Sequence, residues 1–219
     1  AAVGAALEHR EHVLIEAPPG MGKPVSALHP PVAYALRNGK RVFVLTAKTL
    51  QQDMAFRVLR LLDTSAACHA LRLRAKAKMC ANDQVLCHEE YCPYAREYAL
   101  KVHSSGLVDR LLEAHSILEP ETIFEASRET EVCPFEISLE LAGRSDVVVC
   151  DYNYAFEPTA ALSDSGRDGD LSDTILVIDE IHNLVDRGRG YYSPVLSSRK
   201  ARQAAEAMVA GRDLIHLRI

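Results

Sequence analysis

Short apolar runs alternate with helical periodicities along this chain of 219 residues. Each run is brief and rich in β-branched side chains, which is typical of a buried strand. The runs are residues 12–16 (HVLIE), 41–45 (RVFVL), 146–150 (DVVVC) and 174–178 (TILVI). Residues 25–36 predict a helix that is interrupted at His29-Pro30-Pro31, and residues 49–63 predict an uninterrupted helix. This order of strands and helices is typical of a parallel α/β sheet.

The order breaks between residues 68 and 144. That segment holds five of the six cysteines and helical stretches such as residues 95–118, and we predict no strand within it. Residues 163–173 (SDSGRDGDLSD) predict a polar surface loop between the last two strands. We therefore expect one α/β domain that is interrupted by a small, mostly helical, cysteine-bearing insertion.

The tail differs from the rest of the chain because no strand closes it. Residues 198–210 predict a helix, and the sequence stops at Ile219 without a further element. We expect the chain to be a fragment of a longer protein.

Composition narrows the possibilities without selecting a function. Apolar residues make up 48% and charged residues 25% of the chain, as in ordinary globular domains. The net charge of −5 argues against a wholly basic nucleic-acid coat, though not against a local basic groove. Since no run of about 18 apolar residues and no signal-peptide pattern occurs, we expect no membrane association and a cytoplasmic location.

A loop rich in glycine and proline follows the first apolar run. In order it reads Ala17, Pro18, Pro19, Gly20, Met21, Gly22, Lys23 and Pro24. Between a strand and a helix, such a loop presents converging backbone N–H groups and a positive helix N-terminus to phosphates. Gly20 and Gly22 permit the tight backbone, and Lys23 is expected to reach the β- and γ-phosphates of a nucleotide.

This loop departs from the GxxxxGK[ST] pattern at both ends. Ala17 replaces the first glycine, which is a mild change. Pro24 replaces the Ser or Thr whose hydroxyl binds magnesium, and it removes a backbone N–H, although a first helical turn tolerates proline. We predict weaker binding of magnesium and nucleotide, and impaired hydrolysis. Considered alone, the segment could also be a Gly/Pro turn that contains a lysine by chance.

An acidic motif, residues 177–182 (VIDEIH), follows the last apolar run. Asp179 is expected at the carboxyl end of a strand, where open α/β sheets bind their ligands. It would hold magnesium through the water shell of the ion, while Glu180 orients or deprotonates the attacking water. His182 is a candidate for linking the nucleotide state to the rest of the protein. A turn capped by Asp179 explains this motif alone, but not its pairing with the loop at residues 17–24.

Basic side chains alternate immediately before the cysteine-rich region, and they are Arg72, Arg74, Lys76 and Lys78. An extended backbone would place all four on one side, an arrangement suited to tracking the phosphates of single-stranded DNA. A solvated charged face is the alternative. Aromatic side chains that could stack on bases, or equally pack in the core, are Tyr91, Tyr94, Tyr152 and Tyr154.

Four cysteines are candidates for one metal site, namely Cys80, Cys87, Cys92 and Cys133. Four thiolates suit a [4Fe–4S] cluster, and cysteine followed by proline, as at Cys133, is a local feature of such sites. A structural zinc ion is the alternative, although the spacings lack CxxC knuckles. Cys150 ends an apolar run and is expected to be a buried core thiol, whereas Cys68 could compete for ligation.

In this order, the motifs resemble superfamily 2 helicases of the XPD/DinG type, which are DEAH-box DNA helicases with an iron–sulfur cluster inserted in the first motor domain. The matching segments are residues 17–23, 45–49 (LTAKT), 151–154 (DYNY) and 179–182 (DEIH). The resemblance implies a RecA-like P-loop fold, ATP and Mg²⁺ as cofactors, a [4Fe–4S] cluster on the four cysteines, and DNA contacts from Thr46 and Lys48. Ile181 stands where the family box usually has alanine and leaves its neighbours in register.

The resemblance also implies a function. The family couples ATP hydrolysis to translocation along single-stranded DNA, typically 5′ to 3′, and to the unwinding of forked DNA, with the inserted region as a wedge. We expect a role in DNA repair and, in a bacterium, association with the nucleoid. Two alternatives stay open: a degenerate, non-hydrolysing DNA-binding relative in which Pro24 has ended hydrolysis, and a non-helicase P-loop ATPase with a zinc site.

The expected domains follow from the same resemblance. Residues 1–67 and 145–190 form the two parts of helicase domain 1, residues 68–144 form the iron–sulfur insertion, and residues 191–219 begin a helical, arch-like insertion. Unwinding requires a second motor domain, which this sequence does not contain. We therefore expect the chain alone to be at best a weak binder of nucleotide or DNA.

Overall fold

The computed structural model describes residues 2–18, 22–62, 68–157, 172–193 and 197–209. The chain divides into two compact units, Ala1–Leu184 and Val185–Ile219. The second unit holds most of α11 (His182–Tyr191) and all of α12 (Ser198–Val209). Within the described ranges, no helix has both the length and the apolar character needed to cross a membrane.

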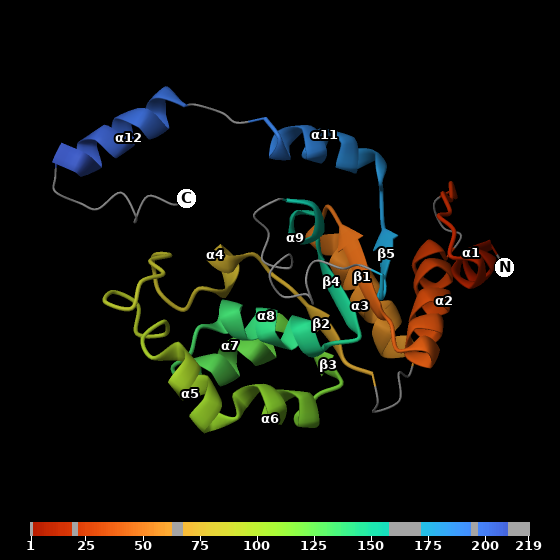
Figure 1. The fold of residues 1–219 in the computed structure, drawn as a ribbon, viewed down its shortest axis with the longest axis horizontal. Helices are drawn as coiled ribbons and strands as arrows, with labels where there is room; N and C mark the ends of the chain where they lie inside the picture. Colours follow the sequence, from red (N-terminus) through yellow and green to blue (C-terminus); the bar gives the residue numbers. More distant parts are fainter. Residues whose placement is uncertain (1, 19–21, 63–67, 158–171, 194–196, 210–219) are drawn as a thin grey trace. The chain divides into compact units, whose positions relative to one another are not determined.

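Five parallel strands form one sheet in the order β3-β2-β4-β1-β5 (Figure 1). The strands are β1 (Arg41–Thr46), β2 (Ala70–Arg72), β3 (Ile117–Leu118), β4 (Val147–Asp151) and β5 (Thr174–Ile178). Val44 of β1 is the register partner of both Val149 and Val177, so β1 is paired along both of its edges. The predicted parallel α/β sheet is confirmed: the strands expected at residues 41–45, 146–150 and 174–178 correspond to β1, β4 and β5.

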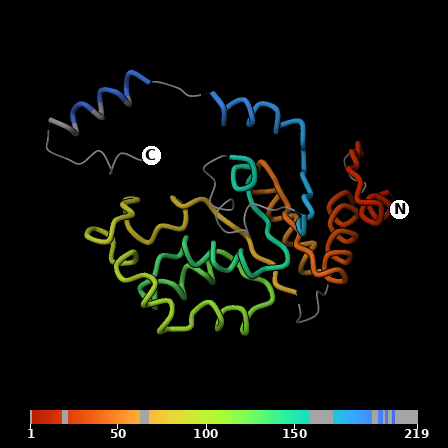
Figure 2. Tube along the Cα trace, in the orientation of Figure 1, coloured from red at the N-terminus to blue at the C-terminus, as the bar shows by residue number. Residues whose placement is uncertain are grey.

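Helices cover both faces of this sheet, as the Cα trace in Figure 2 shows. In the first unit they are α1 (Ala2–His9), α2 (Lys23–Asn38), α3 (Thr49–Leu61), α4 (Lys76–Met79), α5 (Tyr98–Ser105), α6 (Leu107–Ala114), α7 (Pro120–Glu129), α8 (Pro134–Arg144) and α9 (Asn153–Phe156). Helices α2 and α3 pack on one face, and α1 packs on α2. Helices α6, α7 and α8 pack on the other face. The sheet is therefore the middle layer of three.

Two apolar cores result, because successive residues of a strand point to opposite faces of a sheet. Val42 and Val44 of β1 join the core beneath α2 and α3. Phe43 and Leu45 join the core beneath α6, α7 and α8. Each of these four side chains is at most 7% exposed. A sheet buried on both faces accounts for the continuous apolar runs seen in its central strands.

The prediction of no strand between residues 68 and 144 is wrong. β2 pairs with β4, and β3 pairs with β2, so this segment supplies one side of the sheet. Ala70 and Leu71 enter the two cores in alternation, as a strand requires. Helices dominate the rest of the segment, as expected, but the cysteine-bearing region is fused to the sheet rather than inserted beside it.

Residues 12–16 form no strand, contrary to the prediction. Val13, Leu14 and Ile15 are 46%, 81% and 54% exposed and have no sheet partner. The apolar run predicted local strand character, but a strand also needs a neighbour, and β5 pairs only with β1 within the described residues. The expected interruption at Pro30 and Pro31 is also wrong, because α2 continues through both prolines.

Candidate nucleotide site and adjoining groove

The acidic motif lies at the carboxyl edge of the sheet, as the sequence predicts. The backbone N–H of Asp179 donates to the carbonyl oxygen of Leu45 at 2.9 Å, which extends the β1–β5 ladder by one residue. Glu180 then turns the chain with φ of 52°, a left-handed conformation that is unusual for a residue other than glycine. This turn leads directly into α11 and presents the two carboxylates next to each other.

Lys23 of the glycine- and proline-rich loop lies within electrostatic reach of Asp179. Burial and the neighbouring Glu180 carboxylate raise the pKa of Asp179, while the backbone N–H of Glu180 and the charge of Lys23 lower it in part. The Lys23 side chain is exposed at the start of α2. The charge of Lys23 therefore acts on Asp179, although the two residues are far apart in sequence.

The rest of the loop is only partly described. Gly22 precedes α2 with φ of 69°, a backbone conformation that glycine adopts without a steric penalty. Pro24 occupies the first turn of α2, where the missing N–H costs no helical hydrogen bond. Ala17 is half-buried and Pro18 is exposed. Pro19, Gly20 and Met21 lie outside the described residues.

His182 lies beside Glu180, at 3.5 Å from its Nδ1 atom to the Oε2 atom of the carboxylate. The two form an ion pair when the imidazole is protonated. Both side chains are substantially exposed, at 71% and 40%. His182 is thus within reach of the acidic turn without being held in a single position by packing.

Tyr152 connects the acidic turn with β4, and sequence reasoning did not assign it this position. Its side chain is fully buried, and its hydroxyl donates to the carbonyl oxygens of Asp179 and Glu180, the latter at 3.1 Å. The sequence signal is limited to the DYNY run and to the fact that Tyr152 is one of four tyrosines that could stack or pack.

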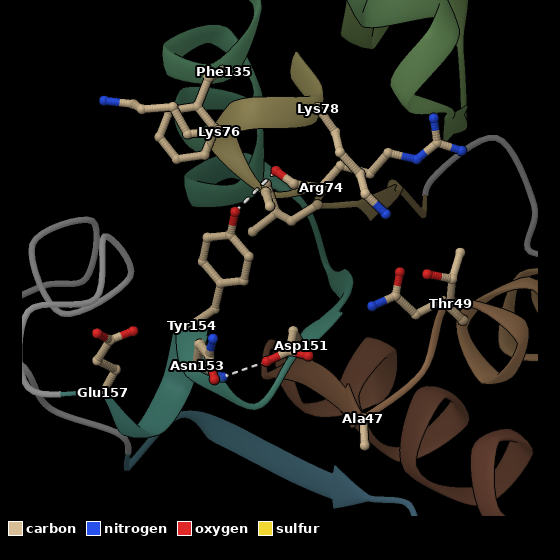
Figure 3. Close-up of a pocket in the computed structure, with 13 residues that line it drawn as sticks. Ala47, Thr49, Arg74, Lys76, Lys78, Phe135, Asp151, Asn153, Tyr154 and Glu157 are labelled. Atoms are coloured by element: carbon tan, nitrogen blue, oxygen red, sulfur yellow. Dashed lines mark hydrogen bonds between the residues drawn. The ribbon is translucent and has the colours of Figure 1, made fainter. Parts of the chain in front are cut away.

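A cavity of about 500 Å³ adjoins the carboxyl ends of β1 and β4 (Figure 3). Its lining residues are Ala47, Thr49, Gln52, Leu73, Arg74, Ala75, Lys76, Lys78, Phe135, Asp151, Asn153, Tyr154 and Glu157. This cavity is called the groove below. The hydroxyl of Tyr154 donates to the carbonyl oxygen of Arg74 at 2.9 Å and so connects two walls of the groove. Burial raises the pKa of Tyr154, which keeps its hydroxyl protonated and able to donate.

The basic residues do not form the single extended strip that the alternation predicts. Arg72 lies in β2 with its side chain 8% exposed, where it forms ion pairs with Asp53 and, at 3.0 Å, with Glu119. Lys76 and Lys78 lie in the short helix α4 rather than in an extended segment. The prediction is therefore wrong for Arg72, whose charge is neutralised in the interior.

The remaining basic candidates, Arg74, Lys76 and Lys78, are less fully neutralised by acidic neighbours than Arg72 is. Arg74 pairs with Glu121 at 2.6 Å, and Lys76 pairs with Glu136 at 3.3 Å. Lys78 has no ion-pair partner within the described part of the chain, and it lines the groove.

The two candidates after β1, Thr46 and Lys48, do not line the groove and differ from each other. Thr46 is 1% exposed, so its side chain is not accessible to DNA. Lys48 is exposed at the start of α3. Of this pair, only Lys48 can contact a ligand.

The four candidate cysteines are free thiols in different surroundings. Cys87 is exposed and Cys92 is buried, and the amide of Asn82 donates to the sulfur of Cys92 at 3.1 Å. Cys80 lies nearby in sequence and donates to the carbonyl oxygen of Gln84 at 3.8 Å. Among the described residues, no three Cys, His, Asp or Glu side chains are arranged to hold a metal ion.

Lys76 connects two of these cysteines electrostatically. Burial alone would lower the pKa of Lys76, but Glu136 raises it, and Cys87 and Cys133 also raise it. Cys133 begins α8, and burial raises the pKa of its thiol, while the backbone N–H groups of Glu136 and Phe135 lower it. Cys87 and Cys133 therefore share one cationic neighbour despite their distance in sequence.

Cys68 and Cys150 belong to the apolar cores. Both are fully buried, Cys150 on the face of α8 and Cys68 on the face of α3. Burial raises the pKa of the Cys150 thiol far above its usual value, which makes the thiolate needed for metal binding unfavourable. The expectation of a core thiol at Cys150 is confirmed, and Cys68 lies in the core opposite to the one that Cys133 contacts.

The fold defines a parallel α/β protein with an acidic turn at the carboxyl edge of its sheet. The family model DEAD_2 matches residues 44–201, which is more than half of the chain. The chain belongs to the DEAD_2 family.

Similar proteins agree with this assignment. The regulator of telomere elongation helicase 1 homolog of Drosophila erecta is 24% identical over 122 residues, which are 51% of this chain and 12% of that protein. The ATP-dependent DNA helicase CHL1 of Coccidioides immitis is 30% identical over 96 residues, 43% of this chain and 10% of that protein. This chain thus spans only a small part of the relatives it matches.

A solved structure shares the fold. The XPD helicase superposes with a TM-score of 0.65 and 21% identity, covering 94% of this chain and 35% of that one. This likeness confirms the RecA-like fold class, and together with the family match it confirms the resemblance to XPD-type superfamily 2 helicases.

Proposed function

We propose that this chain is the first motor domain of an ATP-dependent DNA helicase. The observation that carries the proposal is the position of the Asp179–Glu180 turn at the carboxyl edge of one parallel sheet, with the charge of Lys23 near enough to lower the pKa of Asp179 in part. Ligands of open α/β sheets bind at that edge, and a lysine opposite a carboxylate pair matches the chemistry of phosphoryl transfer from ATP. The two relatives, one named a helicase homolog and the other an ATP-dependent DNA helicase, are consistent with this activity.

Each residue of the site has a distinct proposed role. The Lys23 ammonium binds the β- and γ-phosphates, and the non-proline residues of the loop at 17–24 offer them backbone N–H groups. Asp179 holds Mg²⁺, which supplies positive charge to the phosphates when it is bound. Glu180 orients the attacking water and accepts its proton, while His182 restrains the Glu180 carboxylate through their 3.5 Å contact.

We further infer that the groove binds single-stranded DNA. Lys78, Lys76 and Arg74 supply positive charge on one wall, and Lys48 extends it at the start of α3. Phosphates would displace the exposed carboxylates that pair with Arg74 and Lys76, because exposed ion pairs contribute little stability. The ring of Tyr154 offers a surface for stacking beside these cations.

Cys80, Cys87, Cys92 and Cys133 are proposed to hold a [4Fe–4S] cluster. All four are free thiols, and the backbone N–H groups at the start of α8 point to the sulfur of Cys133, as suits a thiolate ligand. The bound cluster would supply a cross-link between residues 80–92 and α8. Cluster binding would also require the four thiols to come closer to one another, because the described cysteines do not form a metal-binding group.

The domain boundaries remain part of the proposal. Residues 1–67 and 145–190 would form the motor domain, residues 68–144 the cluster-bearing region with strands β2 and β3, and residues 191–219 the beginning of an arch-like insertion. The proposal also includes the unwinding of forked DNA, a role in DNA repair and association with DNA in the cell. These depend on a second motor domain that completes the ATP cleft.

Pro24 supports a second candidate function, a DNA-binding relative that does not hydrolyse ATP. It stands in the first turn of α2 and offers neither a hydroxyl for Mg²⁺ nor a backbone N–H for phosphate. The test is ATP turnover, with single-stranded DNA present, by the chain joined to its second motor domain, compared with Pro24→Thr. We expect low turnover that rises in the variant. Absence of turnover in both, with DNA binding retained, would favour the non-hydrolysing relative.

A further inference from the structure

Tyr152 is a buried polar group whose hydroxyl is directed at the acidic turn. Its side chain is 0% exposed and belongs to the core beneath α8. A buried hydroxyl requires a hydrogen-bond partner, and here it has two, the carbonyl oxygens of Asp179 and Glu180. Core packing alone would be served by phenylalanine, so the hydroxyl has a separate task.

That task concerns a strained turn. Glu180 has a left-handed backbone, which a residue with a Cβ adopts only when surrounding contacts enforce it. Its carbonyl oxygen accepts three hydrogen bonds, from the Tyr152 hydroxyl at 3.1 Å, the Asn183 N–H at 2.9 Å and the Asn183 side-chain amide at 3.1 Å. The direction of the Glu180 carboxylate therefore depends on Tyr152 and Asn183.

Tyr152 also belongs to the segment that forms a wall of the groove. Its sequence neighbours Asp151, Asn153 and Tyr154 all line the cavity (Figure 3). The N–H of Asn153 donates to the Asp151 carboxylate at 2.9 Å, and Tyr154 is tied to Arg74. The segment is consequently held as one unit, with its outer side chains on the groove and the Tyr152 ring on the acidic turn.

We propose that Tyr152 is a positioning residue that couples occupancy of the groove by single-stranded DNA to the geometry of the Asp179–Glu180 turn. A ligand that shifts residues 151–154 moves the Tyr152 hydroxyl, and both acceptor carbonyls follow it. The proposal rests on the proposed function for the identity of the two ligands. Its structural part, that the hydroxyl holds the turn, does not depend on either ligand.

The test uses Tyr152→Phe, which removes the hydroxyl and keeps the ring. Tyr98→Phe is the matched control, because its hydroxyl donates to Glu140 at 2.7 Å and Tyr98 neither lines the groove nor belongs to the acidic turn. The affinity for a fluorescent ATP analogue with Mg²⁺ is measured with and without an oligothymidylate, and the ratio of the two affinities is the coupling factor. Amide hydrogen exchange of residues 179–184 is followed in the same three proteins.

We expect coupling of at least about fivefold in the wild type and in Tyr98→Phe, the lower end of ordinary allosteric coupling. In Tyr152→Phe the factor should fall to about one, with oligothymidylate affinity within about twofold of the wild type and faster exchange at residues 179–184. A KM effect alone would not imitate this result, since each affinity is measured separately at equilibrium.

Asn183→Ala keeps the proposal testable if Tyr152→Phe folds poorly. It removes the other side-chain donor to the Glu180 carbonyl without touching the groove, so exchange should quicken while coupling persists. Unchanged exchange and coupling in Tyr152→Phe, or loss of coupling in Asn183→Ala, would overturn the proposal. If the wild type joined to its second motor domain binds neither ligand, the proposed function fails, and the exchange comparison still decides whether the hydroxyl holds the turn.

Discussion

The carboxyl edge of the sheet and the segment that carries Cys80, Cys87 and Cys92 are organised by different forces. At the edge, backbone ladders fix the functional residues: Asp151 is the register partner of Thr46, and Asp179 continues the ladder of β5. The cysteine segment is mostly turns and bends with exposed side chains. No described metal-ligating group of three occurs there, although the thiols are close in sequence.

This difference shows which sequence motifs are positioned by the fold alone and which depend on a bound ligand for their arrangement. The parallel strands β1 and β5 hold the acidic motif at their carboxyl ends whether or not a nucleotide is bound. Thiols on irregular backbone have no such scaffold, and their arrangement depends on the group that they bind. The two regions should therefore respond differently to mutation.

The largest effect is expected at the edge, from Glu180→Gln. Loss of the general base should lower ATP turnover about 10²–10⁴-fold in the chain joined to its second motor domain, because the amide cannot accept the proton of water. Glu129→Gln, an exposed change on α7, is the control and should leave turnover unchanged. Steady-state turnover with single-stranded DNA checks this, and full turnover in Glu180→Gln would show that the edge is not the active site.

The core beneath the edge should respond next most strongly. Leu141→Ala removes a side chain that is 0% exposed and should lower the free energy of unfolding by about 2–5 kcal/mol. Val85→Ala alters the cysteine segment at a site that is 43% exposed, and should change it by about 0.5 kcal/mol or less. Urea unfolding of both variants measures the contrast. Equal losses would mean that the cysteine segment is as tightly packed as the sheet.

A pair of cysteine variants separates ligation from packing. Cys87→Ser changes an exposed thiol, so it should abolish iron incorporation after anaerobic purification and leave the iron-free fold intact. Cys150→Ser places a hydroxyl in the core and should cost about 1–3 kcal/mol while iron incorporation persists. Iron and sulfide analysis with the visible absorption spectrum reports the first property, and urea unfolding reports the second. Zinc in place of iron would refute the cluster.

The smallest effect is expected from Asp179→Asn without ligands. Burial and Glu180 raise the pKa of Asp179, so ionisation is less favourable in the folded than in the unfolded chain. At pH 7 the ionised carboxylate therefore lowers stability, and this loss disappears as the pH falls below about 4, the ordinary pKa of aspartate. Thermal unfolding should show a slightly higher Tm for the variant at pH 7 and no gain near pH 4. A lower Tm at pH 7 would contradict the assigned environment.

Much of the fold could be predicted because the central strands are buried on both faces. Their apolar runs within residues 41–45 and 146–150 leave no polar face for an alternative structure. The short strands β2 and β3 escaped prediction because three and two residues carry too little periodicity. The prediction of a strand at residues 12–16 is wrong for the converse reason, since an apolar run specifies strand character but not a neighbouring strand to pair with.

The residues of the site could be predicted where they lie directly at the ends of strands or helices, but not where tertiary contacts determine their role. Asp179, Glu180 and Lys23 come directly after or before regular elements, so their positions follow from the order of those elements. Arg72 looked available because alternation is a local signal, whereas its partners Asp53 and Glu119 come from elsewhere in the sequence. The Tyr152 hydroxyl was unpredictable for the same reason.

The central claim is that Lys23 and the acidic turn form one nucleotide site. The most direct test is equilibrium binding of a fluorescent ATP analogue with Mg²⁺ to the wild type, Lys23→Ala and Lys40→Ala. Lys40 is the matched control, because it lies before β1 at the opposite edge of the sheet and pairs with Asp173 at 3.3 Å. We expect Lys23→Ala to weaken binding at least about tenfold, a loss of about 1.4 kcal/mol, and Lys40→Ala to bind as the wild type does. Equal binding by all three proteins would contradict the account.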